Sequence, residues 1–364
     1  MLTSLLAIAI LSAQSDSNGV PAALLDKFKT GVNVTRWFCY LAPGDHADHY
    51  RTYLTDADFA AFKRLGVGFV RLCISPDAVY RNGSPDAACL TAIDKALDRF
   101  AAAHIAVVWD LHDNGQLKLD APGQDNAGFV SFWKALAEHY RGKREHEIVF
   151  ELVNEPVFQN NPEVWYDLQE KTVKAVRGVD PKRTVMVSAT SWSGIDTLAR
   201  FKPLEESNLI YSFHCYDPFF FTHQGAEWVG EYPQKLKSVP FPSSPEAVAA
   251  ILPQNDEKYR GALERYGKQR YDDAYLLGRL KLCTDWAASH HVPVVLGEFG
   301  AYPKVSPPES RARWFQGMRK AIHTLHLANA IWGYDDGLGL GRTIDSDGTL
   351  HLDPVTLRSF YGDK

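Results

Sequence analysis

The chain has 364 residues, of which 45 % are hydrophobic and 12 % aromatic, and 39 Lys and Arg residues against 44 Asp and Glu residues give a net charge of −5. This apolar content excludes a disordered chain and is sufficient for a large core. The weakly acidic balance, without a basic run, argues against nucleic acid as a partner. The length fits one barrel-sized domain or two smaller domains.

The first 18 residues differ from the rest of the chain. A short apolar run at 5–11 precedes a polar stretch at 12–19, as in a signal peptide, although no Lys or Arg occurs before Lys27. The run is too short to span a bilayer, and no later stretch resembles a transmembrane segment. We therefore expect a signal peptide or a disordered start at 1–18, a secreted or periplasmic protein without membrane contact, and one folded domain at 19–364.

Eight short apolar runs, most of them 35 to 40 residues apart, alternate with segments of helical spacing. Apolar strands that alternate with helices indicate a parallel sheet covered by helices. Eight such units, with no G-x-G-x-x-G after the first run, predict a closed (β/α)8 TIM barrel. The expected strands are 31–37, 67–74, 105–111, 147–153, 184–189, 209–213, 292–296 and 330–334, and the expected helices include 56–65, 90–104, 129–140, 163–176 and 311–325.

The interval between the sixth and seventh runs is more than twice the usual length. It contains a Pro-rich aromatic stretch at 218–253 and a helical pattern at 257–289. We expect an enlarged loop after strand six, an insert at about 219–276, rather than a separate small lobe. The aromatic block at 219–228 either lines a cleft or forms the small core of the insert, and we favour the core.

Polar side chains end or interrupt these apolar runs, at the position where barrels of this class carry their active sites. Each has an ordinary structural explanation when taken alone, such as a helix cap or a satisfied buried group. A convergence of so many at one end of a barrel indicates a functional site. These residues are Arg71, Asp110, His112, Asn154, Glu155, His214, Tyr216, Glu298 and Trp332.

Two opposed carboxylic acids, Glu155 and Glu298, are the groups that glycoside hydrolysis requires. One must be protonated to give its proton to the leaving oxygen, and the other must be ionised to attack the sugar. Arg71 close to Glu298 would favour the charged form of that carboxyl, and burial would raise the pKa of Glu155. The different surroundings of the two carboxyl groups would thus make Glu155 the acid and Glu298 the nucleophile.

With these residues the chain resembles glycoside hydrolase family 5, a cellulase-type family in the clan of (β/α)8 retaining glycosidases. The motifs that carry the resemblance are Asn154-Glu155-Pro156, His214-x-Tyr216 and Gly297-Glu298-Phe299-Gly300, and it extends from Gly31 onward. The resemblance implies that Glu155 is the acid/base and Glu298 the nucleophile. It implies supporting or substrate-binding roles for Arg71, His112, Asn154, His214, Tyr216 and Trp332.

The resemblance also assigns individual roles. Asn154 would bind the sugar 2-hydroxyl, and Tyr216 would hold the nucleophile. The two histidines would bind hydroxyls or orient Glu155. Trp332 would stack on the sugar beside the cleaved bond. Trp37 and Trp192 resemble the stacking tryptophans of cellulase-type members, or else pack beneath their loops.

We therefore expect a retaining endo-β-1,4-glucanase that acts as a monomer on a β-glucan polysaccharide or oligosaccharide, without a cofactor or metal. The alternatives within the family are a β-mannanase, a β-1,3-glucanase, a xyloglucanase and an exo-acting β-glucosidase. From other classes there remain a non-catalytic carbohydrate-binding barrel and a metal-dependent hydrolase with Asp110, His112 and His214 as ligands. The five cysteines form no C-x-x-C motif, and we expect buried thiols rather than a bridge between Cys73 and Cys89.

Overall fold

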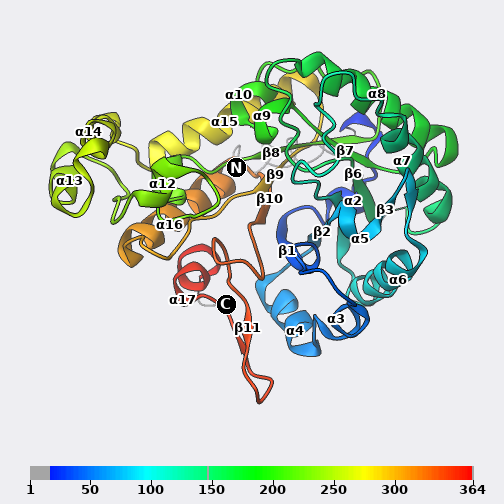
Figure 1. Cartoon of the computed structure of the whole chain (residues 1–364), viewed down its shortest axis with the longest axis horizontal. Helices are drawn as coiled ribbons and strands as arrows, with labels where there is room; N and C mark the ends of the chain where they lie inside the picture. Colours follow the sequence, from blue (N-terminus) through cyan, green and yellow to red (C-terminus); the bar gives the residue numbers. More distant parts are fainter. Residues whose placement is uncertain (1–16, 146, 363–364) are drawn as a thin grey trace, which may run out of the picture.

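A computed structural model describes residues 17–145 and 147–362, so the expected signal segment lies, apart from its last two residues, outside the described part of the chain. Its centre is a closed barrel of eight parallel strands in the order β1-β10-β9-β8-β7-β6-β5-β2 (Figure 1). The barrel strands are β1 (Thr30–Phe38), β2 (Phe69–Ile74), β5 (Ala106–Leu111), β6 (Ile148–Glu151), β7 (Val185–Ser188), β8 (Leu209–His214), β9 (Val294–Glu298) and β10 (Ala328–Ile331).

The TIM-barrel prediction is confirmed, and each expected strand overlaps one barrel strand. Every residue of β2, β5, β6, β7 and β8 is buried, because one face of these strands meets the barrel interior and the other meets the helices. Such two-sided burial explains why the strands are recognisable as continuous apolar runs.

The helices that cover the barrel begin and end at recognisable signals. Helix α4 (Asp56–Leu65) begins with a capping box between Thr55 and Asp58 and ends at Gly66, whose φ of 73° suits a left-handed cap. The other helices between β1 and β8 are α3 (Ala47–Thr52), α5 (Pro76–Val79), α6 (Ala87–Ala102), α7 (Ala127–Tyr140), α8 (Pro162–Val179), α9 (Thr190–Ser193) and α10 (Ile195–Leu198).

The first part of the long connection between β8 and β9, residues 219–269, is a set of shorter helices that extends sideways from the barrel (Figure 1). The buried side chains of this insert, among them Phe241 and Leu263, join the main hydrophobic cluster of the barrel. The insert is therefore packed as part of the same core. Its helices are α11 (Phe219–Thr222), α12 (Glu231–Lys235), α13 (Pro245–Ala249), η2 (Leu252–Gln254), η3 (Glu257–Tyr259) and α14 (Arg260–Gln269).

The expectation of one helical segment over 257–289 is wrong. Helix α14 ends at Gln269, and the next residue, Arg270, has a left-handed φ of 52°. Helix α15 (Asp273–His290) then begins with the Asp272 carboxylate accepting from the backbone N–H of Tyr275. The short helix η3 and the helices α14 and α15 therefore share this segment. The insert ends before Asp273, so the expected boundary at 276 falls in the first turn of α15.

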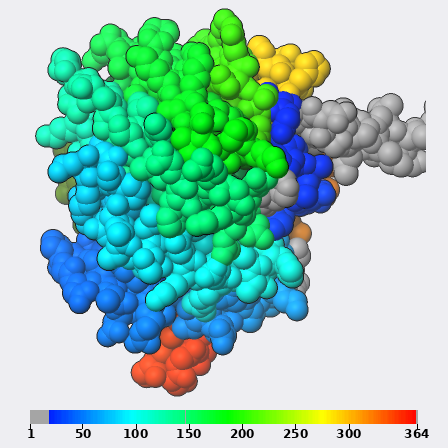
Figure 2. All heavy atoms as spheres, turned by 90° about the vertical axis from the view of Figure 1, so that its right-hand side faces the viewer, coloured from blue at the N-terminus to red at the C-terminus, as the bar shows by residue number. Residues whose placement is uncertain are grey.

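The remaining elements lie before β1, between α5 and α6, and after β9 along the chain. Figure 2 shows the hairpin of β11 (Thr343–Ile344) and β12 (Leu350–His351) protruding at the lower edge of the molecule. In residues 17–145 and 147–362, no helix combines the length and apolar character needed to cross a membrane. The other elements are η1 (Ser17–Gly19), α2 (Ala22–Leu25), β3 (Tyr80–Arg81), β4 (Ser84–Pro85), α16 (Pro308–Thr324), α17 (Pro354–Thr356) and η4 (Leu357–Tyr361).

Candidate active site

The carboxyl ends of the barrel strands bring the expected polar residues to one mouth. Neighbouring strands align Asn33 of β1 with Arg71 of β2, and His214 of β8 with Glu298 of β9. The remaining candidates lie in the last residues of a strand or just after it. Each of the eight catalytic and supporting candidates makes a hydrogen bond or a ring contact with another member of the group. These eight are Arg71, His112, Asn154, Glu155, His214, Tyr216, Glu298 and Trp332.

Arg71 is buried at the centre of this group and uses its guanidinium to tie four strands together. It donates from Nη1 to Glu298 Oε1 at 2.7 Å, from Nη2 to Asn154 Oδ1 at 2.7 Å, and from Nε to Glu151 Oε2 at 2.6 Å. Nη1 also donates to Asn33 Oδ1 at 3.0 Å. Because the neighbouring carboxylates outweigh burial, the pKa of Arg71 lies well above its usual value, and the side chain stays charged.

Glu155 and Glu298 face one another across His214. The His214 Nδ1 atom lies 2.8 Å from Glu155 Oε1 and 3.5 Å from Glu298 Oε2. One carboxyl oxygen of Glu155, one of Glu298 and a ring nitrogen of His214 all lie within 4.8 Å of each other. Tyr216 donates its hydroxyl to Glu298 Oε2 at 2.8 Å, so the second oxygen of this carboxyl is also held.

Burial raises the pKa of Glu155 to about 7, against the opposing effects of His112 and Arg71. Its side chain is 26 % exposed and therefore open to a substrate. Burial also raises the pKa of Glu298, in opposition to His214 and Arg71. The expected contact between Arg71 and Glu298 is present, but it offsets only part of the cost of burying that carboxylate.

The two neighbours of the carboxyl pair keep their neutral forms. Burial lowers the pKa of His214 to about 4, although Glu298 acts in the opposite sense. Burial and the adjacent Glu298 raise the pKa of Tyr216 well above its usual value. His214 therefore adds no charge between the two carboxyls at neutral pH, and Tyr216 remains a hydrogen-bond donor.

His112 is held from both sides of its ring. Its Nδ1 lies 2.7 Å from Asp110 Oδ2, and its Nε2 lies 2.9 Å from the Tyr40 hydroxyl. Burial raises the pKa of Asp110, but Arg71 and His112 outweigh that effect, so the pKa lies below its usual value. The His112 ring stacks on Trp332 with centroids 5.2 Å apart, which fixes the position of that indole.

Three residues that take part in this network were not expected from the sequence. Asn33 donates to the backbone carbonyls of Gly297, Ala330 and Ile331. Glu151 is buried against Arg71, and Tyr40, with a left-handed φ of 56°, contacts His112. A polar residue inside a buried apolar run is the signal that pointed to Arg71, and it also marks Asn33 and Glu151.

The two additional tryptophans differ in their surroundings. Trp37 is only 2 % exposed, donates from Nε1 to the Tyr50 carbonyl oxygen at 2.9 Å and packs against Phe38 and Phe100. The expectation of a sugar platform at Trp37 is therefore not met, because other side chains cover its ring. Trp192 is 48 % exposed at the mouth, in a run of left-handed residues from Ser191 to Ser193.

The metal-dependent alternative required Asp110, His112 and His214 in one ligand group. In the described part of the chain these residues fall into two groups, Cys73 with Asp110 and His112, and His214 with the two glutamates. In each group Arg71 already contacts a carboxylate, Asp110 at 3.1 Å and Glu298 at 2.7 Å. The guanidinium would repel a metal cation, so these donors suit proton transfer better than metal binding.

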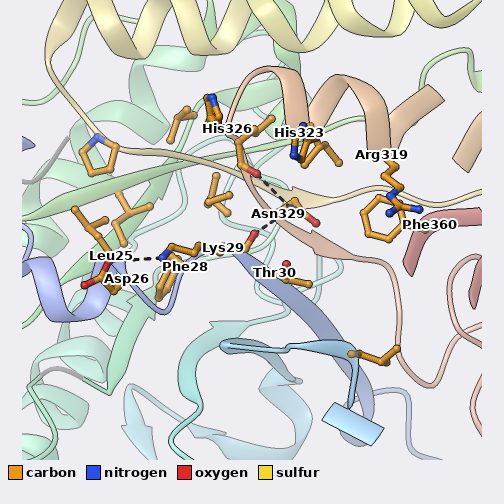
Figure 3. Close-up of a pocket in the computed structure, with 18 of the residues that line it drawn as sticks. Leu25, Asp26, Phe28, Lys29, Thr30, Arg319, His323, His326, Asn329 and Phe360 are labelled. Atoms are coloured by element: carbon orange, nitrogen blue, oxygen red, sulfur yellow. Dashed lines mark hydrogen bonds and ion pairs between the residues drawn. The ribbon is translucent and has the colours of Figure 1, made fainter. Parts of the chain in front are cut away.

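A cavity of about 590 Å³ lies at the opposite end of the barrel (Figure 3). It is lined by residues at the starts of β1 and β10, including Thr30 and Asn329, and by Arg319 and His323 of α16. None of the expected site residues borders it. Barrel enzymes place their chemistry at the carboxyl ends of the strands, so this cavity is not the candidate active site.

The family model described as "Cellulase (glycosyl hydrolase family 5)" matches residues 26–336. Among similar proteins, Endoglucanase C of Acetivibrio thermocellus is 26 % identical over 319 residues, which cover 84 % of this chain and 91 % of that protein. Endoglucanase 3 of Fibrobacter succinogenes is 28 % identical over 330 residues. The match covers 84 % of this chain but spans only about half, 49 %, of that relative.

Solved structures show the same fold. The endoglucanase Cel5A of Thermotoga maritima superposes with a TM-score of 0.74 and 24 % identity, over 93 % of this chain and 98 % of that chain. A structure titled "endoglucanase" superposes with a TM-score of 0.73 and 25 % identity, over 94 % of this chain and all of that chain, 100 %.

Proposed function

Because the chain belongs to glycosyl hydrolase family 5, we propose that it is a retaining endo-β-1,4-glucanase. The observation that carries this proposal is the distance within the carboxyl pair, since oxygens of Glu155 and Glu298 lie within 4.8 Å. Retaining glycosidases hold their carboxyls about 5–5.5 Å apart, whereas inverting enzymes need about 6.5–9.5 Å to admit a water molecule. The names of the endoglucanase relatives support the β-1,4-glucan substrate and the endo mode of action.

In the first step, Glu298 attacks the anomeric carbon while the bond to the leaving sugar oxygen breaks. Glu155 donates its proton to that oxygen, which leaves a glycosyl ester on Glu298. In the second step, Glu155 takes a proton from water, the water oxygen attacks the anomeric carbon, and the ester bond to Glu298 breaks. Each step passes through a transition state with positive charge on the sugar ring.

The surrounding residues serve these two steps. Arg71 and Tyr216 each hold one oxygen of Glu298, so the carboxylate keeps a fixed orientation for attack. Arg71 occupies the Asn154 Oδ1 atom and Asn154 Nδ2 lies 3.4 Å from His112 Nε2, which leaves one amide N–H of Asn154 to bind a sugar hydroxyl. Trp332 supplies an aromatic face beside the carboxyl pair, and Trp192 offers an exposed face farther out.

The configuration of the first product tests the mechanism. NMR of cello-oligosaccharide hydrolysis should show the β-anomer first, and a first α-anomer would contradict the scheme.

Glu298→Ala should abolish turnover but keep oligosaccharide binding. EDTA should leave the rate unchanged. In a panel of carboxymethylcellulose, mannan, laminarin and xyloglucan, we expect the fastest cleavage for the cellulose derivative.

We also propose that the enzyme acts as a monomer outside the cytoplasm. The apolar run at 5–11 supports export, and an insoluble or polymeric glucan is accessible only there. Light scattering should give the mass of one chain. Amino-terminal sequencing of the mature protein should begin near residue 19.

A further inference from the structure

Glu151 is a buried carboxylate that neither catalytic step uses. It is the last residue of β6 and is 2 % exposed. Its side chain lies on the same face of the strand as that of Val149, which packs in the barrel interior with residues from strands all around the barrel. An apolar side chain would satisfy the fold at this position, because a buried carboxylate is costly even when it is paired. Folding alone therefore does not explain a carboxylate here.

Arg71 is the only hydrogen-bond partner of the Glu151 carboxylate within residues 17–145 and 147–362. Oε2 accepts from Arg71 Nε at 2.6 Å, and Oε1 accepts from Arg71 Nη2 at 3.1 Å. A paired contact of this kind fixes the plane of a guanidinium as well as its position. In the same part of the chain Glu151 makes no hydrogen bond to Glu155 or Glu298, so an effect on catalysis would pass through Arg71.

The contact with Glu151 determines how the N–H groups of Arg71 are shared. Nε and one N–H of Nη2 point to Glu151, which leaves the other N–H of Nη2 for Asn154 Oδ1 at 2.7 Å. The N–H groups of Nη1 point to Asn33 Oδ1 at 3.0 Å and to Glu298 Oε1 at 2.7 Å. A rotation of the guanidinium would therefore disturb its bonds to Asn154 and to the nucleophile together.

Glu151 also adds charge that the burial of Arg71 does not require. The guanidinium already lies 2.7 Å from Glu298 and 3.1 Å from Asp110, so two carboxylates compensate it without Glu151. Burial raises the pKa of Glu151 while Arg71 opposes it, and Asp110 and Glu298 raise it further. The interaction between two carboxylates is mutual, so Glu151 in turn destabilises the ionised form of Glu298.

We propose that Glu151 is a positioning residue for the nucleophile. It fixes the plane of the Arg71 guanidinium and takes up part of its charge, so that Arg71 orients Glu298 without fully neutralising it. A carboxylate whose charge is bound too tightly by its partner is a weaker nucleophile, because nucleophilicity falls as basicity falls. This inference rests on the proposed function and assigns a role in it to a carboxylate that does not touch the substrate.

Two substitutions separate the charge of Glu151 from its geometry. Glu151→Gln keeps the length of the side chain but removes the charge, and Glu151→Asp keeps the charge but is one methylene shorter. Asp180→Asn is the matched control. Asp180 is also buried, and its Oδ2 accepts from Nε and Nη2 of buried Arg183 at 3.1 and 2.9 Å. It lies between α8 and β7, at the end of the barrel opposite to the mouth.

The measurement is the rate at which Glu298 of the full-length enzyme is labelled by a deoxyfluoro cellobioside with a dinitrophenyl leaving group. This leaving group needs no proton, so the rate reports attack by Glu298 alone. The fluorine slows hydrolysis of the glycosyl ester, and the labelled enzyme accumulates. Mass spectrometry then counts only enzyme that is folded and reactive.

Glu151→Gln should slow labelling about 10-fold or more, because Arg71 loses its fixed orientation. It should also move the acid limb of the pH profile down by about 0.5–1 pH unit, since the loss of a like charge stabilises the Glu298 carboxylate. Glu151→Asp should slow labelling but leave the acid limb at the wild-type pH. Asp180→Asn should change neither the rate nor the limb.

The other ionisable groups around the nucleophile are the same in all these variants, so a displaced acid limb in Glu151→Gln reports the lost charge. The groups that face Glu298 are Arg71, Glu155, His214 and Tyr216, with His112 farther away, and those that face Glu151 are Arg71, Asp110 and Glu298.

Other results would overturn the role of Glu151. These are wild-type labelling by Glu151→Gln, slowed labelling with an unmoved acid limb in that variant, or an equal loss of rate in Asp180→Asn. If Glu151→Gln does not fold, a wild-type labelling rate in Glu151→Asp overturns the role. A wild type that is labelled at Glu298 while the Glu151 variants match it would reject this inference alone. A wild type that is never labelled at Glu298 would contradict the proposed function.

Discussion

The two catalytic candidates are the same chemical group in different surroundings. Glu155 is partly exposed and contacts neutral His214, whereas Glu298 is buried and held by Arg71 and Tyr216. A guanidinium and a phenol hydroxyl favour the ionised carboxyl, and a neutral imidazole leaves its partner free to carry a proton. These contacts support the proposed roles of Glu155 as acid and Glu298 as nucleophile, against the effect of burial, which raises the pKa of both carboxyls.

The pKa of Glu155, raised to about 7, predicts an alkaline limit to activity. The acid must be protonated, so kcat/KM on cello-oligosaccharides should fall as the pH rises through about 7. A pH–rate profile tests this. With a dinitrophenyl glycoside, whose leaving group needs no proton, the alkaline limb should disappear, and its persistence would assign that limb to another group.

Gly297 leaves room for His214. A Cβ atom at this position would lie 2.5 Å from Ser212 Oγ and 3.1 Å from His214 Nε2. Gly297→Ala should displace the imidazole from Glu155 and lower kcat about 10-fold or more, with a smaller change in KM. Gly278→Ala is the control, since no heavy atom lies within 4 Å of a Cβ there, and it should keep full activity.

At the scale of elements, the insert depends on one buried amide. Gln224 donates from Nε2 to the carbonyl oxygens of Phe221 and Val239 and to Ser306 Oγ, and its Oε1 accepts from the Val239 N–H. These bonds close the first turn of the insert and fasten it to the loop after β9. The packing of the insert against the barrel therefore includes a buried polar contact.

Removal of this amide should loosen the insert. Gln224→Ala leaves several buried groups without partners and should cost about 1–3 kcal/mol of unfolding free energy. Calorimetry should show a lower Tm, and limited proteolysis should cut the insert first. Exposed Gln269→Ala is the control. An unchanged Tm for Gln224→Ala would mean that the insert is held by its apolar contacts alone.

The elements also show where sequence patterns are reliable. The eight strands were predictable because most of their residues are buried on both faces of the strand, which favours continuous apolar runs. The helical pattern at 257–289 did not reveal the break between α14 and α15. The residue with the left-handed conformation at the break is Arg270, and not a glycine or proline that would have marked the end of a helix. The Asp272 cap was the available local signal.

At the scale of the whole molecule, all five cysteines are buried thiols, and Cys73 and Cys89 do not form a bridge. Burial raises the pKa of Cys89 to about 12 and raises that of Cys73 as well, so both stay protonated and unreactive. Dithiothreitol should leave the Tm unchanged. A thiol reagent should react slowly with the native enzyme, and after denaturation it should label five thiols. Labelling of fewer than five thiols would indicate a disulfide.

The sequence by itself determined the barrel and the positions of Glu155 and Glu298, because strand burial and strand ends are local properties that leave local patterns. Only the tertiary structure decided which residues contact Arg71, because its partners lie far from it in the sequence, as Glu298 does. It also decided that Trp37 is covered while Trp192 is exposed. Contacts between distant segments depend on how strands and loops close around each other, and no local pattern records that geometry.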